Sequence, residues 1–378
     1  MQINTDFFNK TKKYKTPFFI YDLEILKNNY HEIAAAFPNV SIFYAMKCNP
    51  HQRFITTLYQ EGSGFEIASL AEAEHLIKEG VDSTKIVCFH PIKSPEFLEY
   101  LHKHNINVLA ADSYEEVDKI AKYAPNSKIV PRVLIDNKDS AWDLSGKFGM
   151  PATEIIQLLE YIKSKDLIPY GLTTHVGSQC HNESSWISAL DQYKYIWDEM
   201  KKKEIHLKLL SLGGGLPVQY RKPIVSISSI GKRIMSHISQ LFPSSDDIII
   251  TLEPGRGMAA TTSILVTSVF GTAKRGNESW LYIETGTYNG LIEAIETEDR
   301  QFFPLAVEDN NRPQKKYCIG GPSCVTLDTP FKDVILPELF LGDRLYILNA
   351  GAYLSSCAAP FNGFPIPAEY IYNEINII

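Results

Sequence analysis

The sequence predicts an α/β protein whose larger part is a (β/α)8 TIM barrel and whose remainder is antiparallel β structure. Eight short apolar segments alternate with amphipathic helical stretches over about 220 residues, which is the size of such a barrel. The segments are apolar on both faces, as in Ile248-Ile249-Ile250-Thr251-Leu252, a pattern typical of parallel strands covered by helices. After residue 260 helical periodicity stops, and short strands separated by Gly, Pro and Asn follow.

The expected barrel strands are 41–46, 64–68, 86–90, 107–111, 128–134, 169–175, 207–212 and 247–252. The expected helices include 26–37, 70–79, 95–104, 114–123, 152–163, 186–203 and 226–241. An open doubly wound sheet is the alternative, but it usually has fewer strands, and no GxGxxG motif follows the first strand here. We therefore predict a barrel domain over 24–260. Residues 1–23, with the aromatic strand 16–22, plus 261–378 are expected to form a discontinuous β-sandwich- or β-barrel-like domain.

Composition excludes several classes of function. The chain has 378 residues, of which 44% are hydrophobic and 21% charged, as in soluble globular proteins. Its net charge of −7 argues against nucleic-acid binding. The sequence shows no membrane span and no signal peptide. The six cysteines have neither metal-ligand spacing nor the density of a disulfide framework, so we expect no metal and a cytoplasmic location.

Polar or glycine-rich residues follow six of the eight predicted barrel strands. Carboxyl ends of barrel strands meet at one face, where barrel enzymes carry their active sites. The first of these residues, Lys47, is either a solvated lysine that closes a strand or an amine whose pKa is lowered for Schiff-base chemistry. The other strand ends carry Glu66, Arg132, the segment 175–178, the glycines 213–215 and the segment 253–257.

Each of these residues has a plain structural alternative when it is taken alone. Gly213-Gly214-Gly215 could be a flexible turn, but its pairing with Gly255-Arg256-Gly257 at the next strand end favours a phosphate site. Glu253 could form an ion pair with an arginine or lie against a pyridine nitrogen, and His175 could be a core histidine or stack on a cofactor ring. Together with Lys47 they describe a site for pyridoxal 5′-phosphate (PLP).

These motifs resemble the fold-type III PLP-dependent decarboxylases, the group of ornithine and diaminopimelate decarboxylases and of the alanine racemase barrel. The resemblance runs from about Thr16 to Tyr372 and is closest to ornithine decarboxylase. The segments that carry it are Tyr44-Ala45-Met46-Lys47-Cys48-Asn49, Gly64-Phe65-Glu66-Ile67-Ala68-Ser69, His175-Val176-Gly177-Ser178, Leu212-Gly213-Gly214-Gly215, Glu253-Pro254-Gly255-Arg256, Gly321-Pro322-Ser323-Cys324, Gly351-Ala352-Tyr353 and Phe361-Asn362-Gly363-Phe364.

The resemblance implies a role for each matching residue. Lys47 is expected to form the Schiff base with PLP, His175 to stack on the ring, and Glu253 to pair with the pyridine nitrogen. Arg132 is expected to support the site, and Glu66 stands where ornithine decarboxylase has an aspartate. The implied cofactor-binding set is completed by Ser178, Gly214, Gly215, Gly255, Arg256 and Tyr353.

In the family, active sites lie at a dimer interface, so the resemblance also implies a homodimer with shared sites. Cys324 is then expected to protonate the carbanion after CO2 leaves, and Phe361 is expected to line the interface. The alternative for Cys324 is a purely structural role as a buried cysteine. Lys147 and Asp328 match a cross-subunit ion pair of ornithine decarboxylase.

The substrate-binding residues depart from the family pattern. Val325 replaces the acid that binds the substrate's distal amine in the family. The position of a second such acid falls at about Thr297, which is a threonine here but has three acidic neighbours in the sequence, Glu296, Glu298 and Asp299. Burying an ammonium against valine without another carboxylate is costly. Either the acidic cluster binds the distal amine, or the distal end of the substrate is not a free short-chain amine.

The sequence therefore predicts decarboxylation of an L-amino acid of the ornithine or lysine type, or of a distally modified diamino acid. The expected pathways are polyamine metabolism or siderophore and natural-product metabolism. An amino-acid racemase is the alternative chemistry, disfavoured by Cys324 and the Phe361–Phe364 segment. A catalytically silent regulatory homologue is the alternative class, disfavoured because the residues for PLP remain.

Overall fold

A closed ring of short parallel strands forms the barrel in the computed structural model, which describes residues 1–378 except 2, 137–139, 143–145, 244–246, 297–301 and 376–378. Hydrogen bonds join six strands in the order β4-β3-β2-β12-β11-β9 and three in the order β5-β6-β8, and single bridges Cys88–Leu109 and Arg132–Thr173 connect the two sets. The strands are β2 (Ser41–Ala45), β3 (Gly64–Glu66), β4 (Ile86–Val87), β5 (Val108–Ala111), β6 (Lys128–Pro131), β8 (Ile168–Pro169), β9 (Gly171–Leu172), β11 (Leu209–Ser211) and β12 (Ile249–Leu252). The predicted α/β barrel is confirmed.

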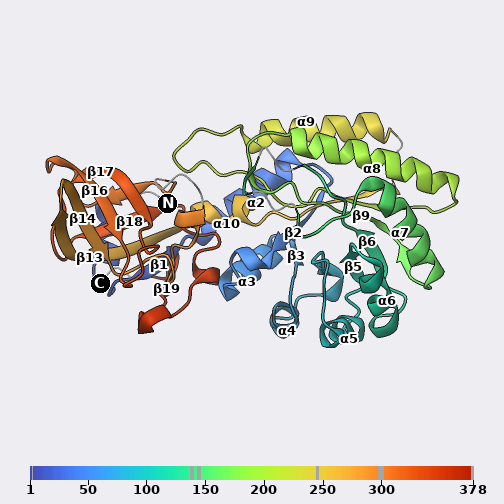
Figure 1. Ribbon diagram of the computed structural model, residues 1–378, viewed down its shortest axis with the longest axis horizontal. Coiled ribbons are helices and arrows are strands. Elements are labelled where there is room, and N and C mark those ends of the chain that lie inside the picture. Colours follow the sequence, from blue (N-terminus) through green and yellow to red (C-terminus); the bar gives the residue numbers. More distant parts are fainter. Residues whose placement is uncertain (2, 137–139, 143–145, 244–246, 297–301, 376–378) are drawn as a thin grey trace. The chain divides into compact units, whose positions relative to one another are not determined.

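Helices cover the outside of these strands, as α4 to α7 do around β3 to β6 (Figure 1). Four of them begin at a serine, Ser69, Ser94, Ser113 or Ser226, whose side chain accepts a hydrogen bond from the backbone N–H three residues later. The helices are α2 (Leu23–Ala36), α3 (Gln52–Gln60), α4 (Leu70–Lys78), α5 (Pro95–Lys103), α6 (Tyr114–Tyr123), α7 (Ala152–Ser164), α8 (Ser184–Lys202), α9 (Ile227–Leu241) and α10 (Arg256–Ala259).

A buried ion pair connects the ends of neighbouring barrel strands. Lys93, in the segment that follows β4, lies 3.0 Å from Glu116 of α6, and both side chains are fully buried. The Lys93 ammonium also donates to the carbonyl oxygens of Ala110, at the end of β5, and of His90. These carbonyl bonds satisfy the buried cation, so the pair holds the loops after β4 and β5 in place.

A second set of strands forms the β domain. Residue contacts divide the chain into this unit, made of Met1–Lys27, Val218–Pro223 and Ala259–Ile378, and a barrel unit of Asn28–Pro217 and Ile224–Met258. The sheet order is β15-β18-β13-β14-β16-β17, with β1 beside β13 and β19. The elements are α1 (Thr5–Thr11), β1 (Phe18–Tyr21), β13 (Ser263–Arg275), β14 (Glu278–Ile283), α11 (Glu293–Glu296), β15 (Leu305–Val307), β16 (Gln314–Gly320), β17 (Phe331–Pro337), β18 (Arg344–Leu348) and β19 (Ala368–Ile371).

The sheet of the β domain is mixed rather than purely antiparallel. Most pairs are antiparallel, as expected, but β14 runs parallel to β16 and β1 runs parallel to β19. Both parallel pairs join segments separated by long connections, which leave room for the chain to return before it re-enters the sheet. The domain core includes Phe7, Phe18, Ile20, Ile264 and Tyr346.

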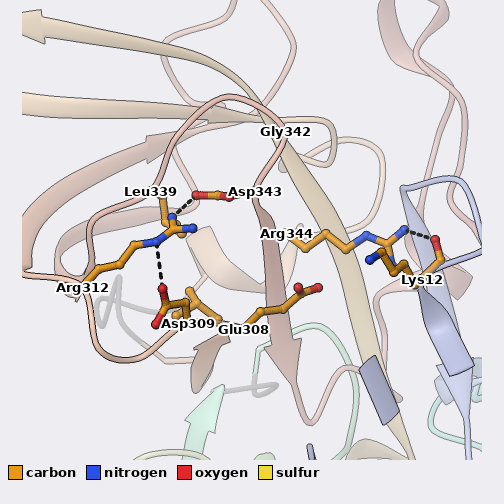
Figure 2. Close-up of a pocket in the computed structure, with 9 residues that line it drawn as sticks. Lys12, Glu308, Asp309, Arg312, Leu339, Gly342, Asp343 and Arg344 are labelled. Carbon is orange, nitrogen blue, oxygen red and sulfur yellow. Dashed lines mark hydrogen bonds and ion pairs between the residues drawn. The ribbon is translucent and has the colours of Figure 1, made fainter. Parts of the chain in front are cut away.

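A charged pocket of about 380 Å³ lies in the β domain (Figure 2). Arg312 forms ion pairs with Asp309 and Asp343, and Arg344 donates to the carbonyl oxygens of Thr11 and Lys12 at the C-terminal end of α1. These arginines are thus engaged in holding the domain together. Of the predicted site residues that the structure describes, none lines the pocket. Within the described part of the chain, none of the helices has both the length and the apolarity needed to span a membrane.

Candidate active site

Lys47 lies on a short 3-10 turn, Met46–Cys48, that begins where β2 ends. Its ammonium is 3.2 Å from the carboxylate of Glu66, the last residue of the neighbouring strand β3, because Ala45 and Glu66 are paired in the sheet. The Lys47 side chain is 45% exposed, whereas that of Glu66 is 3% exposed. An accessible amine is therefore held by a buried carboxylate.

The electrostatic environment of Lys47 differs from the sequence expectation of a lowered pKa. Partial burial lowers the pKa of the amine, but the acidic side chains of Glu66, Glu253 and Glu72 outweigh it, and the net shift is upward. Glu72 is held near Lys47 by a capping box at the start of α4. Ser69 caps the helix, and the Glu72 carboxylate accepts a hydrogen bond from the Ala68 N–H at 2.6 Å. The acidic side chains around Lys47 thus favour its charged ammonium form.

Glu253 follows β12 and is almost completely buried. Its carboxyl accepts a short hydrogen bond from the hydroxyl of Ser211, the last residue of β11, and Ser211 also accepts from the Gly213 N–H at 3.0 Å. Burial, with repulsion from Glu66, raises the pKa of Glu253 to about 8. A protonated pyridine nitrogen is the kind of partner that would favour ionisation of such a buried carboxyl.

His175 is held as a neutral imidazole. Its Nδ1 accepts a hydrogen bond from the Gly177 N–H at 3.0 Å, so the ring proton belongs on Nε2. Burial, assisted by the positive charges of Arg132 and Lys47, lowers its pKa well below the ordinary value. A side chain at Gly214 would place its Cβ 3.1 Å from His175 Nε2, so the glycine leaves this side of the ring open.

The glycine turn after β11 faces a cationic group. Gly215 has a φ of +102°, and a Cβ there would lie 2.6 Å from the Gly177 carbonyl oxygen. Arg256, buried at the start of α10, donates from Nε to the Ser178 hydroxyl at 3.0 Å. A guanidinium and a hydroxyl beside a turn that only glycine fits are suited to a phosphate.

These residues fit PLP by their chemistry. The structure brings together, in the barrel unit, an amine, a neutral imidazole, a buried carboxyl and a phosphate-type cradle. Arg132 adds a half-buried positive charge that interacts with Glu253. Among the described residues, no cluster of His, Cys, Asp and Glu has a metal-binding arrangement.

Comparison with known proteins agrees with this geometry. Residues 23–260 match the family described as "Pyridoxal-dependent decarboxylase, pyridoxal binding domain". The chain belongs to this family. It is accordingly a PLP-dependent decarboxylase by family, with PLP as its cofactor.

Relatives and solved structures extend the match over nearly the whole chain. The lysine/ornithine decarboxylase of Selenomonas ruminantium is 33% identical over 96% of this chain and 91% of its own length. A crystal structure of lysine decarboxylase from that organism superposes with a TM-score of 0.92, at 32% identity over 99% of this chain and 97% of that one. Antizyme inhibitor 2 of Xenopus laevis is 29% identical over 92% of this chain and 79% of its own length, so the similarity extends to a protein not named as an enzyme.

Other predicted residues lie in the β domain. Cys324 is exposed in the loop after β16, next to a half-buried Val325, and Tyr353 has a φ of +56°. Phe361 packs against Tyr288, with ring centroids 4.4 Å apart and the ring planes tilted by 35°. Glu296 ends α11 and is exposed, whereas Thr297, Glu298 and Asp299 fall outside the described residues.

Asp328 proves to have local partners within its own domain. Its carboxylate accepts from the backbone N–H groups of Thr287 and Ser323 at 2.7 and 2.9 Å, which fixes the loop that carries Cys324. Lys147, in the barrel unit, places its ammonium 5.1 Å from the ring centroid of Phe148. The cross-subunit ion pair between Lys147 and Asp328 stays a prediction.

Sequence reasoning missed three residues of the barrel site. Ser211 is a hydroxyl at the end of an otherwise apolar strand, Glu72 stands three residues after a serine cap, and Trp142 contacts Arg256. The first two had signals, since a polar residue in a buried strand and an S-x-x-E capping box are both readable. Trp142 had none, because its role depends on a tertiary contact.

Proposed function

We propose that the protein removes the α-carboxyl group of a diamino acid of the ornithine or lysine type, or of one with a modified distal end. The observation that carries the proposal is the Lys47 amine beside Glu66, in the electrostatic field of the buried Glu253. Names of relatives support the substrate class: besides the lysine/ornithine decarboxylase, a structure of a Paramecium bursaria Chlorella virus arginine decarboxylase bound to agmatine matches with a TM-score of 0.92, at 28% identity over 98% of this chain and all of that one.

PLP, when bound, supplies a ring that accepts electrons from the substrate's Cα as CO2 leaves. In this proposal Lys47 attaches the cofactor, and Glu66, which binds its ammonium in the free protein, positions the amine. Glu253 would keep the pyridine nitrogen protonated, and neutral His175 would pack on the ring without adding a positive charge that opposes this protonation.

The phosphate is held by Ser178, Arg256 and the N–H groups of the glycine turn in this proposal, with Gly255 and Tyr353 completing the set. The thiol of Cys324 donates the proton that replaces CO2 at Cα, and Phe361 lines the substrate space. We propose a homodimer with shared sites, as the resemblance implies. A cytoplasmic location and a place in polyamine or siderophore metabolism belong to the same proposal.

PLP binding provides the first test of this assignment. Protein supplied with PLP is expected to absorb visible light, and borohydride reduction is expected to fix the cofactor to Lys47, as read by peptide mass spectrometry. Lys47→Ala is expected to lose the band and at least about 1,000-fold in kcat, since the covalent attachment and proton transfer depend on this amine. Lys85→Ala, which removes an exposed lysine, serves as the control. Failure of the wild-type protein to take up PLP would refute the enzyme assignment.

Substrate choice is tested by CO2 release from ornithine, lysine, arginine, diaminopimelate and diamino acids acylated or carboxyalkylated at the distal nitrogen. Because Val325 offers no charge to a distal ammonium, we expect weak turnover of ornithine, and Val325→Asp is expected to raise its kcat/KM about tenfold. Val325→Asn, which has the same shape without the charge, is the matched control. Strong ornithine turnover by the wild type would show that another carboxylate, such as Glu296, binds the distal amine.

A further inference from the structure

The connection between β6 and α7 places an aromatic ring over each of two site arginines. The Trp142 ring centroid lies 4.3 Å from Cζ of Arg256, and the Phe148 centroid lies 5.7 Å from Cζ of Arg132. Attraction between a guanidinium and a ring is significant within about 6 Å and strongest for tryptophan. The contact of Trp142 with Arg256 is therefore the stronger of the two.

Trp142 is held in this position by a small two-stranded sheet. Strand β7 (Ser140–Trp142) pairs antiparallel with β10 (Ser178–Cys180), and in this register Trp142 is opposite Ser178. The Ser140 hydroxyl donates to the Trp142 carbonyl oxygen at 2.9 Å. Gly177 permits the close approach, because a Cβ there would lie 2.1 Å from Ser140 Oγ. The sheet thus brings Trp142 beside the predicted phosphate serine.

Arg256 is consequently constrained from two directions. Its Nε is bonded to Ser178 at one edge of the guanidinium, and the Trp142 ring packs against the same planar group. Arg256 is buried, so the attraction to the ring is only weakly screened by water. The Arg256 side chain, which is long and can adopt many rotamers, is in this way ordered before a ligand binds. Less conformational entropy is therefore lost on binding.

We propose that Trp142 is a positioning residue for cofactor binding: it holds the guanidinium of Arg256 toward the phosphate and thereby sets the affinity for PLP. The inference rests on the proposed function, because it takes Arg256 as the phosphate-binding arginine. It adds a residue from the β6–α7 connection to a site otherwise built on strand ends.

Equilibrium titration of cofactor-free protein with PLP and with pyridoxal, which has no phosphate, tests the proposal. Trp142→Leu, which keeps apolar bulk but removes the π face, is expected to raise the Kd for PLP about tenfold and to leave the Kd for pyridoxal unchanged. Trp142→Phe is expected to stay within about threefold of wild type for both ligands. Trp280→Ala, a tryptophan removal in the β domain, is the control and is expected to change neither constant.

The Arg256→Ala background separates positioning from a general structural effect. If Trp142 acts through Arg256, Trp142→Leu has no further effect on PLP binding once the arginine is gone. Equal weakening of PLP and pyridoxal, or an undiminished effect in the Arg256→Ala background, would overturn the proposal. So would a wild-type protein that binds PLP while Trp142→Leu binds it equally well. A wild type that binds no PLP would overturn the proposed function together with this inference.

Discussion

Glu253 and Lys47 show how single side chains acquire unusual properties from neighbours that are distant in sequence. Glu253 is buried near a second carboxylate, Glu66, and its pKa rises to about 8 because ionising it in that place is costly. Lys47 meets the opposite condition, since neighbouring acidic side chains, Glu66 first among them, stabilise its ammonium. The same cluster therefore keeps a proton on an acid and a proton on a base.

The raised pKa of Glu253 leads to a prediction about stability without PLP. Between pH 4.5 and about 8 the folded chain retains a proton that the unfolded chain releases, so this group's contribution to stability is lost as pH rises through that interval. Thermal midpoints of cofactor-free wild type and Glu253→Gln, measured from pH 5 to 8, are expected to diverge. The variant should gain on the order of a few degrees relative to wild type at the alkaline end. Parallel profiles would contradict the assigned pKa.

For single residues, the sequence predicted which side chains lie at the carboxyl ends of the barrel strands, but not their protonation states. The strand-end positions of Lys47, Glu66, His175 and Glu253 followed from barrel geometry. The direction of the Lys47 pKa shift did not, because it is the difference between burial and three carboxylate interactions. The sign of such a balance depends on distances between side chains that only the folded chain defines.

Among the structural elements, the turn after β11 is the most constrained part of the site. Gly213 and Gly215 have φ values of +66° and +102°, and their neighbours leave no room for a Cβ. The turn can bring its N–H groups close to an anion only while these positions remain glycine.

Gly215→Ala is expected to raise the Kd for PLP at least about tenfold, because a methyl group would displace Gly177 and the chain beside the phosphate site. Gly80→Ala is the matched control: Gly80 also has a positive φ, +78°, but a Cβ there meets nothing within 4 Å. The control is expected to lose about 1 kcal/mol of stability from backbone strain and to bind PLP normally. Equal PLP affinities for the two variants would show that the turn tolerates a side chain.

Helices were easier to predict from the sequence than strands. The expected helix 114–123 coincides with α6, where an apolar face and the Ser113 cap both signal its bounds. The expected strand 128–134 shortens to β6, Lys128–Pro131, because beyond it the pairing is reduced to single bridges such as Arg132–Thr173. Helix α3, together with β7 and β10, was not predicted, and the two small strands depend on a pairing that no local pattern encodes.

For the whole molecule, the proposed shared active sites make a prediction about mixed chains. Lys47→Ala and Cys324→Ala are each expected to be inactive. After subunit exchange, random pairing of the two variants should restore about a quarter of wild-type activity, because half the dimers are mixed and each contains one intact site. Activity is measured as CO2 release, and exchange is checked by co-purification of differently tagged chains. Exchange without recovered activity would show that Lys47 and Cys324 serve the same site from one chain.

The pairing of β1 also determines the order in which the protein can be completed during synthesis. This strand is fully buried, yet its antiparallel partner is β13 and its parallel partner is β19, where Phe18 lies beside Ala368. The ribosome therefore delivers an apolar strand early and its last partner only after every barrel strand has emerged. Until then β1 has an unpaired edge of the kind that recruits other chains. The nascent protein thus passes through a stage in which the barrel sequence is finished but β1 still lacks its parallel partner.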